Sequence, residues 1–155
     1  MALDYYLTIQ NLNDDIEPNQ VLESLASVFS LQTNPLSNLL MGVGLTVNVF
    51  KEDDDSLFDS AYPDICVAFR IDKFEHYETG MNTMLKMVIW FMSYFKGDMI
   101  FSFDGEQTIF QRISAQLRLN DAPEFWLSSK PAMPNWSSAH SGSLYKPQPK
   151  SVQSV

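Results

Sequence analysis

The sequence predicts an α+β protein, a two-layer sandwich in which a mostly antiparallel sheet carries two helices on one face. Several segments alternate apolar and polar residues, as half-buried strands do, and short links between them favour antiparallel pairing. Two longer segments place their apolar residues at helical spacing instead. These segments follow in the order β-α-β-β-α-β-β within 155 residues, which is about the length of one domain.

The first strand and the first helix are predicted within residues 2–30. The segment "ALDYYLTIQ" alternates, and its apolar face consists of Leu3, Tyr5, Leu7 and Ile9. Turn residues follow, and Pro18 suits the first turn of a helix because its missing N–H has no helical partner there. A helix over residues 18–30 would then present one apolar face, made of Val21, Leu22, Leu25, Val28 and Phe29.

Two further strands are expected on either side of a polar connection. The segment "VGLTVNVF", residues 43–50, places Val43, Leu45, Val47 and Val49 on one face. The segment "DICVAFRID", residues 64–72, does the same with Ile65, Val67, Phe69 and Ile71. The connection "KEDDDSLFDSAYP" between them is long enough for an elaborated hairpin loop.

The second helix is predicted over residues 75–96, and it should be nearly buried. Its wide apolar stripe consists of Tyr77, Met81, Met84, Leu85, Val88, Phe91, Met92 and Phe95. Gly97 follows in a position typical of a helix C-cap. The apolar run "MLKMVIWFMSYF" within it is too short to cross a bilayer, which needs about 20 residues.

A hairpin and a short last strand complete the expected sheet. The strands "DMIFSF" and "QTIFQRI" meet across Asp104-Gly105, which is a strong signal for a tight turn. The segment "LRLN", residues 117–120, predicts one more strand, and "APEFW" should pack its aromatic residues on the body. We therefore expect one domain over residues 1–127. Residues 128–155 are rich in Ser and Pro and predict a mostly disordered tail.

The charge of the chain limits its possible partners. The formal charge is −9, but residues 1–127 carry all 19 acidic residues and seven of the ten basic ones, which gives −12. Such a body repels phosphate backbones, so we expect no nucleic-acid binding, and it attracts basic proteins. The single cysteine, Cys66, rules out an internal disulfide, and "MALDYYLTIQ" lacks the features of a signal peptide. These features favour a cytoplasmic protein that does not enter a membrane.

One stretch looks chemical, namely "FRIDKFEHYETGMNTML", residues 69–85. We interpret it as the polar corner between a strand and a helix: Asp72 would cap the helix, and Glu75 and Glu78 would lie near its positive end. His76 should point about 100° away from Glu75, and the spacing of metal-binding motifs is absent. Cys66 lies mid-strand and should be a small half-buried side chain. We predict no catalytic residues, no metal and no cofactor.

Several motifs together resemble a known family, the immunity proteins of the bacterial swarming-inhibition (Sit) toxin system. They are "FRIDKFEHYETGMNTMLKMVIWFM", "GDMIFSFDGEQTIFQR" and "LRLN" followed by "FW", with "ALDYYLTIQ" at the start. The residues that carry the resemblance are Phe69, Arg70, Asp72, Lys73, Phe74, Gly80, Met81, Gly97, Asp98, Gly105, Glu106, Asn120, Phe125 and Trp126. Asp104 stands where an Asn is expected before Gly-Glu, a change that the turn should tolerate.

The resemblance implies a protein that binds a cognate toxin and blocks it, and that is not an enzyme. Immunity proteins of nuclease toxins are often acidic, so the toxin is expected to be basic. Since connections commonly carry binding residues, the contact residues expected here are Glu52, Asp53, Asp54, Asp55, Glu75, Glu78, Asp104 and Glu106. Two alternatives stay open: a small regulatory or scaffold module, and a hydrolase that would need Asp72, Glu75 and His76 to converge in a pocket.

Overall fold

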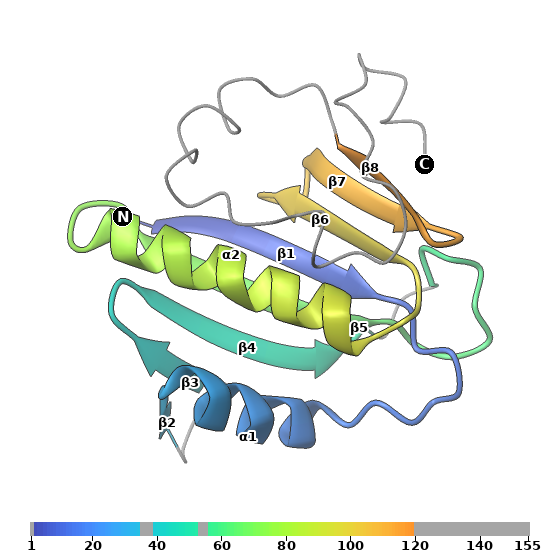
Figure 1. The fold of residues 1–155 in the computed structure, drawn as a ribbon, viewed down its shortest axis with the longest axis horizontal. Helices are drawn as coiled ribbons and strands as arrows, with labels where there is room; N and C mark the ends of the chain where they lie inside the picture. The colour runs from blue at the N-terminus through green and yellow to red at the C-terminus, as the bar shows by residue number, and fades with distance from the viewer. Residues whose placement is uncertain (1, 35–38, 53–55, 120–155) are drawn as a thin grey trace.

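The computed structural model describes residues 2–34, 39–52 and 56–119. They form an eight-stranded antiparallel sheet and two helices, which confirms the predicted fold class (Figure 1). The helices are α1 (Pro18–Phe29) and α2 (Tyr77–Tyr94). The strands are β1 (Ala2–Ile9), β2 (Gln32–Asn34), β3 (Leu39–Gly42), β4 (Leu45–Lys51), β5 (Ile65–Asp72), β6 (Met99–Phe103), β7 (Gln107–Ile113) and β8 (Gln116–Leu119).

The strand order is β2-β3-β4-β5-β1-β6-β7-β8, so the first strand of the chain lies in the middle of the sheet. β1 pairs with β5 over its whole length, from Ala2 opposite Asp72 to Ile9 opposite Ile65. On its other side β1 pairs with β6. Both central neighbours of β1 therefore come from distant parts of the sequence, and the core depends on these long-range pairings.

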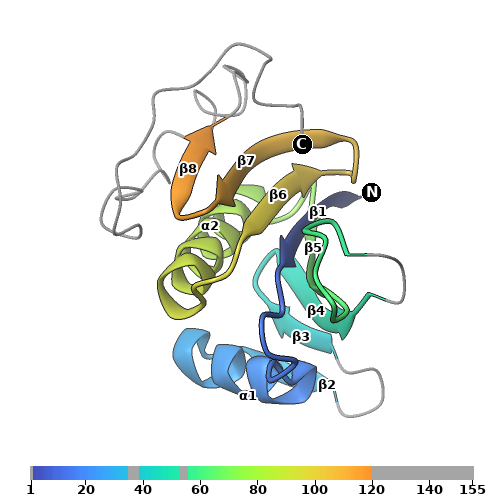
Figure 2. The ribbon, with the colours of Figure 1, turned by 90° about the vertical axis from the view of Figure 1, so that its right-hand side faces the viewer.

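Alternation along the strands gives the sheet one apolar face. Tyr5 lies opposite Phe69 on β5 and opposite Phe103 on β6, while Val47 of β4 pairs with the same Phe69. Because paired residues point to the same side of a sheet, these side chains share one face. Figure 2 shows both helices on one side of the sheet, and the apolar face is buried beneath them.

The first helix differs from its predicted pattern at one position. Val21, Leu22 and Leu25 are buried as expected, whereas Val28 is 54% exposed. The helix ends at Phe29, and Ser30 adopts the left-handed conformation with its N–H donating to Ala26 O. Val28 is therefore turned away from the sheet, so the apolar face of α1 is narrower than the sequence pattern predicted.

Both ends of the second helix also differ from the prediction. The helix begins at Tyr77 rather than at residue 75, and it ends at Tyr94, where Phe95 is the C-cap in an extended conformation. Gly97 is not a left-handed C-cap: a Cβ there would lie 2.8 Å from the carbonyl oxygen of Gln10, so close packing explains this glycine. Met84, Leu85 and Val88 are fully buried, as the apolar stripe predicted.

The hairpins confirm one turn and add others that the sequence analysis did not identify. Asp104 and Gly105 both have positive φ, and the Glu106 N–H donates to Phe103 O at 3.1 Å, as expected for a type I′ turn. Ser114 and Ala115 also have positive φ between β7 and β8, the short last strand that was expected. The strands β2 and β3 were not predicted. Val43 lies before β4 and is 57% exposed, contrary to the predicted pattern.

Some predictions concern residues outside the described ones. They are the contacts at Asp53, Asp54 and Asp55, the packing of residues 122–126, and the tail over residues 128–155.

Candidate functional site

The corner between β5 and α2 has a different local structure from the one predicted. The Asp72 carboxylate accepts hydrogen bonds from the N–H groups of Phe74 (2.9 Å) and Glu75 (3.1 Å), and these bonds lower the pKa of Asp72. Asp72 thus fixes the turn before the helix, whereas the N-cap of α2 is His76, in a left-handed conformation and without a side-chain cap. Glu75 lies outside the helix that was expected to begin there, whereas Glu78 lies in the first turn of α2 as predicted.

The three side chains that a hydrolase would need are all exposed at this corner. Asp72 is held by the turn, and His76 is fixed by its backbone conformation at the start of α2. A shallow hollow nearby is lined by Asp72 and Arg70 but by neither Glu75 nor His76. This geometry gives no support to the hydrolase alternative. Within the described residues, no group of three or more His, Cys, Asp or Glu side chains is arranged to hold a metal ion.

The expected contact residues that the structure describes fall at two opposite ends of the sheet. Asp104 adjoins the start of β1, because its N–H donates to Asp4 O, and this is the end where Asp72 pairs with Ala2. Glu75, Glu78 and Glu106 follow these positions along the chain. Glu52 lies beyond the other end, since its neighbour Lys51 pairs with Ile65, which in turn pairs with Ile9. The eight residues of β1 separate the two groups by about 24 Å.

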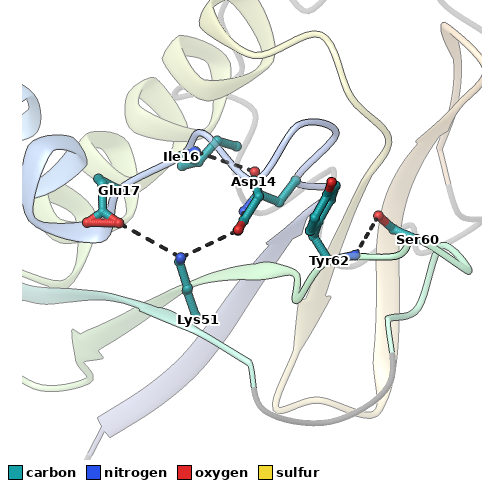
Figure 3. A network of polar contacts seen from close by, with 7 residues as sticks. Asp14, Ile16, Glu17, Lys51, Ser60 and Tyr62 are labelled. Atoms are coloured by element: carbon teal, nitrogen blue, oxygen red, sulfur yellow. Dashed lines mark hydrogen bonds and ion pairs between the residues drawn. The ribbon is translucent and has the colours of Figure 1, made fainter.

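A charged network organises the end of the sheet at which Glu52 lies. Figure 3 shows Lys51 between Asp14 and Glu17, with its Nζ 3.5 Å from Asp14 Oδ1 and 3.8 Å from Glu17 Oε1. Nearby, the buried Asp64 accepts hydrogen bonds from Ser56 Oγ (2.6 Å) and the Leu57 N–H (2.8 Å). These contacts tie the β1–α1 loop to β4 and hold Ser56 and Leu57 against the start of β5.

A cleft of about 770 Å³ opens at this same end, between α1 and the C-terminal part of α2. The lining residues come from two stretches of the chain, residues 10–27 and 90–97. Three acidic side chains that line it are exposed, namely Asp15, Glu17 and Glu23, and Lys96 is the one basic residue in the lining. The sequence pattern did not predict this cleft. It is formed by segments more than 60 positions apart, so no local motif could indicate it.

The aromatic side of the cleft is formed by α2. The rings of Trp90 and Tyr94 stack with centroids 4.9 Å apart and an interplanar angle of 24°, and Tyr94 is 62% exposed. On the opposite side α1 presents short polar residues, Ser24 and Ser27. Because these side chains do not reach across to the aromatic rings, the two helices leave space between them. An acidic cleft with an aromatic wall can accommodate a cationic side chain together with its apolar stem.

The cysteine does not provide a nucleophile. Cys66 is 2% exposed rather than half-buried as expected. Its burial, together with the nearby carboxylates of Glu52 and Asp64, raises its pKa to about 12. The thiolate is the reactive form, so this side chain is unreactive at neutral pH.

Comparison of the chain with known protein families gives one match. A family model described as SitI3-like matches residues 3–130, which include all the strands and helices described except the first residue of β1. This match confirms the resemblance carried by the sequence motifs. No curated protein and no solved structure matches the chain. Neither α1 nor α2 is both long and apolar enough to cross a membrane.

Proposed function

Because the chain belongs to the SitI3-like family, we propose that it is an immunity protein, which binds a cognate toxin and blocks it in an inhibitory complex. The family match over residues 3–130 carries this proposal. In this role the protein catalyses no reaction: it acts by occupying a surface that the toxin needs. Of the three residues that the hydrolase alternative needs, only Asp72 lines the hollow at the corner.

The partner that fits this protein is a toxin with a basic surface. Residues 1–127 carry a formal charge of −12, and among the described residues acidic side chains occur at both ends of the sheet. Opposite charges on two proteins steer their encounter and raise the association rate by about 10- to 1,000-fold. We propose that the eight acidic residues at 52–55, 75, 78, 104 and 106 contribute to this steering, together with the acidic residues of the cleft.

The test is protection in cells followed by binding in solution. A large gene next to the one that encodes this chain would supply the toxin candidate. Cells that produce this toxin should survive when they also produce the protein, and the two purified proteins should form a one-to-one complex. A deliberately unfolded variant such as Met84→Asp serves as the negative control. If the toxin kills cells equally well in the presence of the folded protein, the proposed function is wrong.

A further inference from the structure

The cleft between α1 and α2 combines three properties. It is concave, it has an aromatic wall formed by the half-buried Trp90 and the exposed Tyr94, and it carries more acidic than basic side chains. The corner at the opposite end also exposes aromatic residues, with Phe74 at 73%, but neither Phe74 nor Tyr77 lines the hollow there. The concave surface is where a partner can bury a side chain fully.

On these grounds, and resting on the proposed function, we infer that this cleft binds an Arg- or Lys-bearing segment of the toxin. The stem of such a side chain would lie on the Trp90 and Tyr94 rings, where a cation is attracted to the aromatic face. Its charged head would meet the carboxylates of Asp15 and Glu23. Neither of these two residues forms an ion pair within the part of the chain that the structure describes. Both are therefore available to an incoming cation.

The dimensions of the cleft favour a peptide segment over a single side chain. The part of α1 that lines it runs from Glu17, the N-cap residue, to Ser27, which is about 15 Å along the helix axis. This length accommodates about four residues of an extended chain. The β1–α1 loop at one end of the cleft is held by Lys51 and by the hydrogen bond from the Ile16 N–H to Asn11 Oδ1 (3.4 Å). The site is therefore largely formed before a partner arrives.

Acidic residues can affect toxin binding in two ways. All exposed carboxylates contribute to long-range attraction and so to the association rate. Only carboxylates that contact the partner in a desolvated site slow dissociation. The double variant Asp15→Asn/Glu23→Gln removes two charges from the cleft, and Glu75→Gln/Glu78→Gln removes two charges from the opposite end. The two variants thus have equal net charge and differ in location.

The experiment measures association and dissociation rates with the purified toxin encoded by the neighbouring gene. Both double variants should slow association to a similar extent. The cleft variant should also speed dissociation by about tenfold or more, whereas the corner variant should leave it unchanged. Ser24→Trp, which fills the cleft without changing its charge, should speed dissociation as well. Thermal unfolding of each variant shows that the fold is retained.

A spectroscopic measurement locates the contact directly. The chain has three Trp residues, and Trp126→Phe/Trp136→Phe leaves Trp90 as the only one. When the toxin segment excludes water from the cleft, the Trp90 emission should shift to shorter wavelength. If a complex forms but Trp90 does not respond and only the corner variant speeds dissociation, the cleft is not the contact site, although the proposed function stands. If the protein neither protects cells nor binds the toxin, both proposals are wrong.

Discussion

A Cβ atom on Gly80 would lie 2.4 Å from the carbonyl oxygen of Gly44, so the backbone of α2 and the turn between β3 and β4 are in direct contact. The reverse approach is equally close, since a Cβ on Gly44 would lie 2.3 Å from His76 O. Gly44 also has φ of +80°, and its carbonyl accepts a hydrogen bond from the Asp72 N–H at 2.9 Å. The absence of side chains at these two glycines thus allows the turn, the end of β5 and the first turn of α2 to pack closely together.

The first prediction concerns Gly80→Ala. In an ordinary helix this change stabilises by about 1 kcal/mol, because alanine has the higher helix propensity. Here the added methyl group overlaps the backbone of Gly44, so we expect a loss of about 1–3 kcal/mol instead. Urea unfolding measures the difference. The control is Thr79→Ala, an exposed neighbour at which alanine should cost little. Equal stability of Gly80→Ala and the wild type would contradict the contact.

Several of the motif residues that carry the resemblance have identifiable structural roles. Asp72 fixes the turn before α2, and Gly80 permits the approach of the β3–β4 turn. Gly97 allows the backbone of Gln10 to approach, and the carboxylate of Asp98 accepts a hydrogen bond from the Ser114 N–H at 2.9 Å. These residues have structural roles within the fold.

The second prediction concerns Arg112, whose buried guanidinium lies at the C-terminal end of α2. Its Nη1 donates to Met92 O (2.6 Å), and its Nη2 donates to the carbonyls of Phe95 and Gly97. These carbonyls have no helical partner, and a cation also suits this end of a helix. Arg112→Met should therefore lower the free energy of unfolding by about 3 kcal/mol.

The control for Arg112 is an exposed arginine. Arg70 lies 3.7 Å from Asp4 with a side chain that is 67% exposed. Arg70→Met should cost no more than about 1 kcal/mol, since a surface ion pair is screened by water and salt. Arg112→Lys should recover only part of the loss, because an ammonium group cannot reproduce the planar fork. If Arg112→Met and Arg70→Met unfolded at the same urea concentration, the capping role would be refuted.

Most of the fold could be predicted from the sequence because most elements have a clear apolar period. Val47, Phe69 and Leu85 occupy buried positions within such patterns. The strands β2 and β3 were missed because neither alternates: β2 (Gln-Thr-Asn) has no apolar residue, and β3 (Leu-Leu-Met-Gly) begins with three apolar residues in a row. The end of α2 was predicted wrongly because Gly97 suggested a C-cap. A glycine is needed at this position because the backbone of Gln10, a residue far away in the sequence, packs closely against it.

The candidate site could be predicted only in part. Among the described residues, Glu78 lies in the first turn of α2 rather than in a connection, while the expected position in connections holds for Glu52, Glu75, Asp104 and Glu106. The separation of the described acidic residues into two groups follows from the strand order, in which β1 lies between β5 and β6. No local sequence pattern indicates this order. The cleft depends on the juxtaposition of Ser24 and Trp90, which only the packed helices bring together.

The third prediction tests the burial of α2. Met84→Asp or Val88→Asp places a carboxylate at a position with 0% exposure and no cationic partner. An unpaired buried charge costs several kcal/mol, which is a large part of the stability of a domain of this size, so the protein should unfold. Circular dichroism and gel filtration report the loss of structure. An aspartate introduced on the exposed side of the same helix, as in Lys86→Asp, should leave the protein folded. A folded Met84→Asp would contradict the packing.

The fourth prediction concerns stability at alkaline pH. Burial raises the pKa of Cys66 from 9.0 to about 12, which means that the folded protein keeps the thiol protonated after the unfolded chain has released its proton. The contribution of Cys66 to stability is therefore complete below pH 9 and is lost as the pH rises towards 12. Within this window the slope approaches about 1.4 kcal/mol per pH unit. Cys66→Ala should flatten the slope by that amount. Unfolding measured in urea at several pH values compares the two proteins, and equal slopes would show that the thiol is not desolvated.

The last prediction concerns the salt dependence of toxin binding. The screening length falls from about 30 Å at 0.01 M salt to about 8 Å at 0.15 M, so attraction between separated charges weakens strongly over this range. Association with the toxin should therefore slow as salt is added. Replacing residues 52–55 by Ser or Asn removes four negative charges from one connection, and it should slow association and reduce its salt dependence. Stopped-flow mixing measures the rates, and thermal unfolding checks that the fold is retained.

Dissociation should stay nearly constant, because charges at the rim of an interface affect mainly the encounter. An association rate that responds neither to salt nor to these substitutions would mean that charge does not guide this protein to its partner.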